Sequence, residues 1–175
     1  YGMLANIKAH SMVVEKVAAL IAGELSGSNP PISLEKITAG ALLHDIGKTL
    51  CLNSSEDHAA KGMEICLENG LQEIAEIVGE HVLLGDYSPH SPIGEKEIVY
   101  YADKRVNHDV IVSLDRRLAY LLDRYGKGQE AVCRRIRENF ARCEALEKRL
   151  FARLPFTPQG VADIIAAQRH SPVTP

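Results

Sequence analysis

The sequence predicts an all-α protein. Apolar residues recur at spacings of three and four through most of the 175 residues, and no segment sustains the alternation of apolar and polar residues that indicates a strand. Residues that start and stop helices separate these stretches. We therefore expect a bundle of about five to six core helices plus a C-terminal helical extension, without a sheet.

The first two helices are separated by a Ser- and Pro-rich segment at 26–31. The first helix is expected from about Ala5 to Leu25, and Ser33 can cap the second, which runs to about residue 44. The apolar stripe of the first helix consists of Val13, Val14, Val17, Leu20 and Ile21.

Three further helices follow. One is expected from near Asp57 to Asn69-Gly70, because a glycine in a left-handed conformation commonly ends a helix. Another runs from about Leu71 to His81. After a loop at 85–94, the third carries Asp103.

A sixth core helix is marked by leucines between 114 and 125, and it completes a core domain over residues 1–126. Residues 127–170 form the predicted extension, with a long helix over 129–154 and a short one that starts at Thr157-Pro158. The tail 171–175 is expected to be disordered. The long helix carries an apolar stripe made of Val132, Ile136, Phe140, Cys143, Leu146, Leu150 and Leu154. Such a stripe packs on the domain's own core or forms a homodimer contact.

Composition narrows the class of protein. The formal net charge of −3 gives no basic surface for nucleic acid, and the apolar runs are too short to span a membrane. The four cysteines form no CxxC pair, which indicates reduced thiols and a cytoplasmic location. The start at Tyr1-Gly2 suggests a piece of a longer protein.

The pair His44-Asp45 is the most informative feature for function, since it lies at the end of an apolar helical stretch. Neighbouring helix residues point about 100° apart, so both rarely serve one site unless the site lies at the helix end. Burying an imidazole and a carboxylate is costly unless they are paired or bind a cation. The pair therefore predicts partners elsewhere in the chain.

Four metal-capable residues lie on or near predicted apolar helix faces, namely His10, His58, His81 and Asp103. Imidazole and carboxylate together suit divalent transition metals such as Fe, Mn, Ni or Co, with Mg²⁺ a further option. Singly, each histidine is more often a hydrogen-bonded core residue, and Asp103 could cap a helix or pair with Arg105. Their number, together with the doublet, favours a metal site.

The other histidines have weaker claims. His90 lies in a Pro- and Ser-rich loop and His170 near the C-terminal tail, so both are expected at the surface. His108 is close in sequence to Asp103, and its role stays open.

The order of these residues resembles a known family. His10, His44-Asp45 and Asp103 match the H…HD…D signature of HD-domain metal-dependent phosphohydrolases over roughly residues 5–125, and the residues 44–48 are similar to the HDIG subgroup. His58 and His81 resemble the extra ligands of members that hold two metals, such as the bacterial enzymes that split diadenosine tetraphosphate symmetrically. The Gly-Tyr-Pro extension of the HD cyclic-di-GMP phosphodiesterases is absent.

The resemblance implies an HD-domain helical bundle with two divalent ions and a role for each residue. Asp45 would bridge the ions, His10, His44 and Asp103 would complete one shell, and His58 with His81 would complete the other. A water between the ions would be the nucleophile, since paired cations activate water and neutralise charge on a phosphoryl group.

Three lysine or arginine side chains are candidates for binding phosphate. Lys48 lies one turn beyond the doublet, where it could reach a phosphate oxygen or interact with a helix C-terminus. Lys104 is a further candidate. Arg105 is expected on a solvated face.

The sequence thus predicts hydrolysis of a phosphate ester or anhydride of a nucleotide or another small phosphorylated metabolite. Asp45, Lys48 and Lys104 are the expected catalytic residues, with neither nucleic acid nor membrane as a partner. The alternatives are a sensory HD module that only binds a metal or ligand, and a di-iron HD-type oxygenase.

Overall fold

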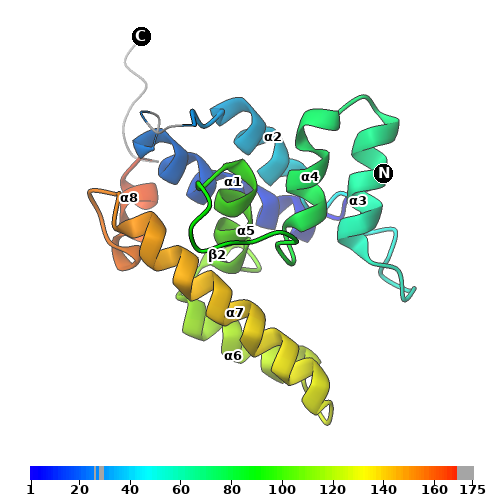
Figure 1. Cartoon of the computed structure of the whole chain (residues 1–175). Helices are drawn as coiled ribbons and strands as arrows, with labels where there is room; N and C mark the ends of the chain where they lie inside the picture. The colour runs from blue at the N-terminus through cyan, green and yellow to red at the C-terminus, as the bar shows by residue number, and fades with distance from the viewer. Residues whose placement is uncertain (26, 28–29, 169–175) are drawn as a thin grey trace.

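The computed structural model describes residues 1–25, 27 and 30–168, which form eight α-helices, a two-stranded hairpin and a short 3-10 helix (Figure 1). The predicted all-α class is therefore confirmed. In chain order the elements are α1 (Ala5–Glu24), α2 (Leu34–Leu43), α3 (His58–Glu68), α4 (Gln72–Glu80), α5 (Glu95–Lys104), β1 (Val106–Asn107), β2 (Val110–Ile111), α6 (Leu114–Tyr125), α7 (Glu130–Phe151), η1 (Pro158–Gly160) and α8 (Val161–Gln168).

Local capping sets the helix boundaries that later position the site. The Ser33 hydroxyl accepts a hydrogen bond from the Lys36 amide at 3.3 Å, which starts α2 as the sequence predicts. The Asp57 carboxylate accepts one from the Ala59 amide at 2.9 Å and starts α3. Gly70, at a φ of 74°, follows α3 in the left-handed region.

Helix α5 lies at the centre of the fold (Figure 1). Every residue from Glu97 to Lys104 is buried, including Tyr100 and Tyr101, which have no exposed surface. Helices α1, α2, α4 and α7 all contact it, and α3 packs on α4. The last turn of α5 is therefore surrounded by other elements, and Asp103 lies there.

The prediction that the chain contains no sheet is wrong in one detail. Strands β1 and β2 pair antiparallel, with Val106 opposite Ile111 and Asn107 opposite Val110. Each strand has only two residues, so no alternation can be read from the sequence. His108, at a φ of 56°, lets the chain reverse between them.

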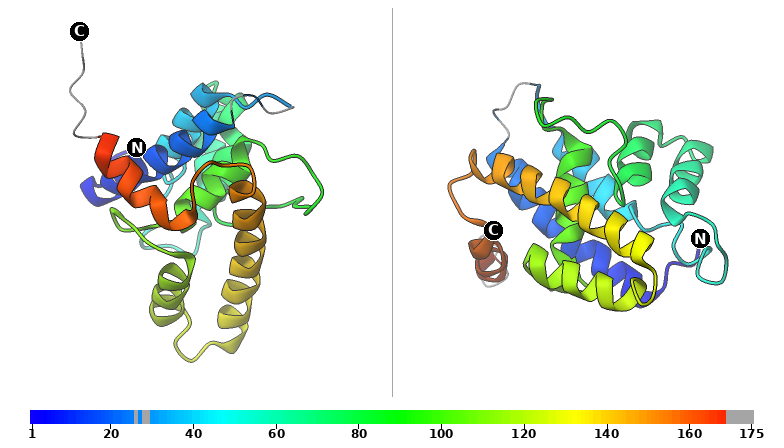
Figure 2. Two further views of the ribbon diagram at one scale, coloured as in Figure 1. Left: turned by 90° about the vertical axis from the view of Figure 1, so that its left-hand side faces the viewer. Right: turned by 60° about the horizontal axis from the view of Figure 1, so that its bottom comes forward.

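The C-terminal helices extend the core. Figure 2 (left) shows α6 and α7 projecting side by side as an antiparallel pair. The predicted apolar stripe of α7 lies largely on the core, since Phe140, Cys143, Leu146 and Leu150 are buried. Helix α8 packs on α1.

The ends of this extension differ from the prediction. Helix α7 ends at Phe151 rather than at residue 154, and Thr157 precedes a 3-10 helix without a side-chain capping bond. His170 and the tail 171–175 lie outside the described residues. Within the described ranges, no helix is long and apolar enough to cross a membrane.

Candidate metal centre

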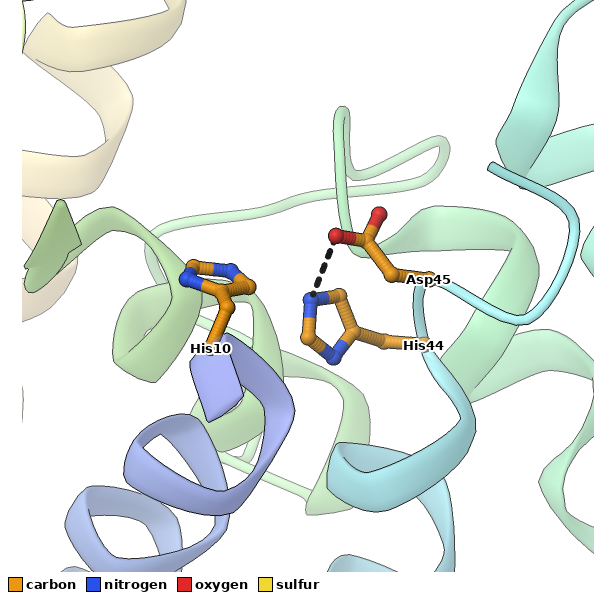
Figure 3. A group of neighbouring side chains, drawn as sticks. All are labelled: His10, His44 and Asp45. Atoms are coloured by element: carbon orange, nitrogen blue, oxygen red, sulfur yellow. Dashed lines mark ion pairs between the residues drawn. The ribbon is translucent and has the colours of Figure 1, made fainter. Parts of the chain in front are cut away.

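The His44-Asp45 pair lies where α2 ends. His44 is the C-cap residue and has no exposed surface, and Asp45 is 1% exposed in the turn that follows. Figure 3 shows both side chains facing His10 of α1. Because the pair sits beyond the last helical residue, its two side chains converge instead of diverging around the helix.

Three histidines have a fixed tautomer. The Nδ1 atoms of His10, His44 and His81 lie 2.6, 2.7 and 2.6 Å from backbone carbonyl oxygens. A carbonyl can only accept, so each Nδ1 carries the proton and donates it. Each Nε2 then keeps a free lone pair, which is the arrangement that metal-binding histidines use.

Asp45 lies between two groups of these Nε2 atoms. Its Oδ2 is 3.5 Å from the Nε2 of His44. Its Oδ1 is 3.4 Å from the Nε2 of His58 and 3.5 Å from that of His81. The two carboxylate oxygens therefore face different sets of histidines, as a bridging ligand requires.

Asp103 completes the first group from the last turn of α5. Its Oδ1 lies 3.0 Å from the Nε2 of His10 and 3.7 Å from the Nε2 of His44. Its Oδ2 accepts a hydrogen bond from the Lys104 ammonium at 2.8 Å. The structure thus brings together all six residues that the sequence predicts as metal ligands.

These residues fit divalent metal ions. Among the described residues, the buried His44 Nε2 and Asp45 Oδ1 have no hydrogen-bond partner. Such orphaned atoms are costly in a folded protein, and a cation would satisfy both. Two triads have ligand atoms close enough to share an ion, His10 with His44 and Asp45, and Asp45 with His58 and His81.

The electrostatics of the cluster keep Asp45 ionised and His81 neutral, which are the states that bind metal, and act in the opposite direction on His44. Burial alone would raise the pKa of Asp45, but the neighbouring His44, His58 and His81 side chains hold it well below its usual range. Burial lowers the pKa of His81 to about 4, so its imidazole stays neutral near pH 7. For His44, the Asp45 and Asp103 carboxylates outweigh the effect of burial and raise the pKa.

The candidate cations have different surroundings. Lys48 donates to Asp45 Oδ2 at 2.7 Å, and its side chain is 38% exposed. Lys104 is buried and donates to the His81 carbonyl at 2.7 Å as well as to Asp103. The prediction that Arg105 lies on a solvated face is wrong. It is 4% exposed, and it bonds to the Val112 carbonyl instead of pairing with Asp103.

The histidines left open by the sequence are also placed. His90 is exposed in the loop before α5, as predicted. His108 touches the centre through its backbone only, because its carbonyl accepts the bond from His10, while its ring packs on Tyr120 at 5.3 Å between centroids.

A cavity of about 420 Å³ opens over the cluster and contains residues that the sequence did not single out. Lys48, Lys104 and Arg117 are its cationic lining residues. Its apolar lining comes from Val82, Leu121, Tyr125, Val132, Ile136 and Phe140. The only signal for Arg117 is its position beside Leu118 within the apolar stripe of the sixth helix.

The HD domain family matches residues 7–125, more than half of the chain. The chain belongs to the HD domain family. This superfamily comprises metal-dependent phosphohydrolases, and its members bind divalent metals. The match ends at the last residue of α6 and leaves α7 and α8 outside it.

Curated relatives carry the same domain within longer chains. The tRNA (cytidine(56)-2'-O)-methyltransferase of Picrophilus torridus is 34% identical over an alignment of 131 residues, and the match covers 66% of this chain and 35% of the methyltransferase. Ribonuclease Y of Thermosipho melanesiensis is 38% identical over 99 residues, which are 56% of this chain and 18% of the ribonuclease. The chain therefore spans about a third or less of these relatives. No solved structure gives a significant match.

Proposed function

We propose that this HD domain hydrolyses a phosphate ester or anhydride of a nucleotide or another small phosphorylated metabolite, with two divalent ions as cofactors. The observation that carries the proposal is the position of Asp45, whose two carboxylate oxygens face separate histidine groups. A carboxylate placed in this way can offer one oxygen to each of two ions, with His44 on one side and His58 and His81 on the other.

The ligands divide as the geometry suggests. His10, His44 and Asp103 would hold one ion and His58 with His81 the other, with Asp45 shared. Paired divalent ions supply Lewis acidity and lower the pKa of a bound water. Asp45 stays ionised beside the histidines, and the fixed Nδ1 bonds of His10, His44 and His81 orient their rings before any metal arrives.

Positive side chains around the cavity support a phosphate substrate. Lys48 is partly exposed, pairs with Asp45 and lines the cavity, so its flexible side chain would be free to donate to a substrate oxygen if Asp45 held metal ions. Lys104 faces the same cavity with two of its three N–H donors already used. Phosphoryl transfer depends mainly on such positioning and charge neutralisation.

A phosphodiester in RNA is a second candidate substrate. It is favoured by the ribonuclease and the tRNA-modifying enzyme among the relatives. The net charge of −3 opposes it, since RNA-binding domains usually present a basic surface.

Turnover by metal-loaded protein tests the proposal. Protein reconstituted with Mn²⁺, Fe²⁺, Co²⁺ or Ni²⁺ should release phosphate or a nucleotide from a panel of nucleotides, sugar phosphates and an oligoribonucleotide. Asp45→Asn should lose activity by about a thousandfold or more. Metal binding without turnover of any phosphate compound would contradict the proposal and favour a sensory module, and dioxygen uptake by a di-iron form would favour an oxygenase.

Metal content tests the assignment of ligands independently of activity. Wild type should bind about two ions per chain, and His58→Ala or His81→Ala should bind about one, as measured by inductively coupled plasma mass spectrometry after dialysis. His90→Ala is the matched control, because His90 is exposed in a loop away from the cluster. An unchanged metal content in both ligand variants would rule out the dinuclear assignment.

A further inference from the structure

The antiparallel pair α6–α7 forms one side of the cavity over the metal centre. Helix α6 is anchored by the buried Leu114 and otherwise packs mainly along α7, so the two helices act as one hairpin (Figure 2, left). Together they contribute Arg117, Leu121, Tyr125, Val132, Ile136, Asn139 and Phe140 to the cavity lining. Most of this wall comes from α7, which lies beyond the residues that match the HD family.

The cavity has two chemically distinct parts. The candidate metal ligands that line the cavity, together with Lys48, Lys104 and Arg117, form the charged part, while the rest of the α6–α7 hairpin supplies aliphatic and aromatic side chains. A volume of about 420 Å³ lies in the range of pockets that enclose a small organic ligand. A ligand complementary to both parts carries a phosphate at one end and a flat apolar group at the other.

Arg117 is held in place at the cavity wall. Its Nη1 donates to the Asn107 side-chain oxygen at 2.8 Å, and its guanidinium carbon lies 5.6 Å from the centroid of the Tyr120 ring. Its Nε is buried and therefore not accessible to a ligand, so the contribution of Arg117 to the cavity is its place among the three cationic lining residues. A guanidinium that is held in orientation at a cavity wall is suited to a phosphate oxygen.

Two hydrogen bonds of Asn139 hold the apolar wall of α7 beside the candidate metal centre. Its side-chain oxygen accepts a hydrogen bond from Tyr100 of α5 at 2.7 Å, and its amide donates to the Val82 carbonyl at 2.9 Å. Val82 directly follows the ligand His81. Helix α7 is thereby pinned beside the metal centre, so the wall is part of the site rather than a separate surface.

We propose that the α6–α7 hairpin is the recognition element of this site, with Arg117 binding the substrate phosphate and the apolar wall receiving an aromatic base. This proposal rests on the proposed function and narrows its substrate to a nucleoside monophosphate, as opposed to a sugar phosphate or an RNA chain. Base contacts with aromatic side chains are worth about 1–3 kcal/mol, or about five- to 150-fold in affinity.

Equilibrium binding to metal-free protein tests this without turnover. Calorimetry in EDTA should show at least one of AMP, GMP, CMP and UMP binding about tenfold or more tightly than ribose 5-phosphate. Ile136→Asp should remove that margin, and the readout is the ratio of the two affinities, because the added carboxylate acts on the phosphate of both ligands alike. Arg117→Met should weaken both ligands about tenfold and preserve the margin.

Two controls match these changes. Arg116→Met removes an exposed arginine next to Arg117, and Ala141→Asp adds a carboxylate on the exposed side of α7; neither residue lines the cavity. Both should bind like wild type, and circular dichroism should show that every variant remains folded.

The outcomes separate this proposal from the proposed function. Equal affinity for the monophosphates and ribose 5-phosphate, no binding of either, or a margin that survives Ile136→Asp overturns it. Tighter binding of an oligoribonucleotide than of any monophosphate overturns it in favour of RNA. Selective binding without turnover by the metal-loaded protein would support it while contradicting the phosphohydrolase proposal.

Discussion

Lys104 organises the metal centre without belonging to its ligand set. Its ammonium is buried, donates to Asp103 at 2.8 Å and to the His81 carbonyl at 2.7 Å, and lies 4.7 Å from the centroid of the Tyr100 ring. It therefore joins the last turn of α5 to the end of α4. The pKa of Asp103 lies well below its usual range because Lys104 and the histidines outweigh its burial.

Replacing this lysine should destabilise the metal-free protein more than the metal-loaded protein. Lys104→Met leaves a buried carboxylate without its partner, a loss that costs about 3–5 kcal/mol. Bound metal should reduce the loss, since a cation at Asp103 takes over part of the neutralisation. Urea denaturation with and without metal measures both effects. Lys61→Met, which removes a surface pair with Glu64, is the control and should leave the midpoint near wild type.

The six candidate ligands could be picked out from the sequence because each is a histidine or aspartate on or near a face that the helical period marks as buried. Arg105 and Arg117 could not be predicted in the same way. An arginine becomes buried, like Arg105, or partly buried, like Arg117, only when other elements bring acceptors to it, here the Val112 carbonyl and the Asn107 side chain. These partners come from the β1–β2 hairpin and the segment after it, which carried no sequence signal.

The turn that follows His44-Asp45 packs closely against the backbone of α3. A Cβ added at Gly47 would lie 2.5 Å from the His58 carbonyl oxygen and 2.8 Å from the Gly62 amide nitrogen. Both atoms are backbone and cannot move aside as a side chain could. Gly47 is therefore required for α3 to bring His58 to the cluster.

Gly47→Ala should push α3 away from the doublet. We expect a loss of about 1–3 kcal/mol in unfolding free energy, and binding of the ion on the His58 side should weaken. Gly23→Ala in α1 is the matched control, since nothing lies within 4 Å of a Cβ there, and it should be neutral or stabilising. A Gly47→Ala protein with wild-type stability and metal content would contradict this account.

Helix boundaries were predictable to within a few residues wherever a side chain decides them. Ser33, Asp57 and Gly70 act locally, so their effect is visible in the sequence. The end of α7 at Phe151 and the strands β1 and β2 depend instead on packing against distant elements. Because of that dependence, the end predicted for α7 was wrong and the two strands were not predicted.

At the scale of the whole molecule, two buried phenols join the core to the long C-terminal helix. Tyr100 donates to Asn139 at 2.7 Å, and Tyr101 donates to Glu147 at 2.7 Å, so both hydroxyls connect α5 to α7. Burial raises the pKa of each phenol above its ordinary value near 10. Each therefore keeps its proton in the folded state after it has lost it in the unfolded chain.

Stability should consequently fall in alkali. Above about pH 10 the unfolded state binds fewer protons than the native state, so the free energy of unfolding decreases by up to about 1.4 kcal/mol per pH unit for each phenol. Urea midpoints between about pH 9 and 11 should show this slope, and Tyr101→Phe should reduce it. A flat profile in wild type, or the same slope in the variant, would contradict the assignment.

The last turn of α5 and its C-cap residue contact two different parts of the molecule. Asp103 faces the metal cluster, while Arg105 donates to the Val112 carbonyl at 2.7 Å and to the Pro158 carbonyl at 2.8 Å and pairs with Glu147 at 3.3 Å. Metal binding at Asp103 and the packing of the C-terminal segment against Arg105 thus both act on the backbone of residues 103–105. Linkage makes such a relation reciprocal: if metal binding tightens the hold on the segment from η1 onward, a ligand that fixes that segment raises metal affinity by the same factor.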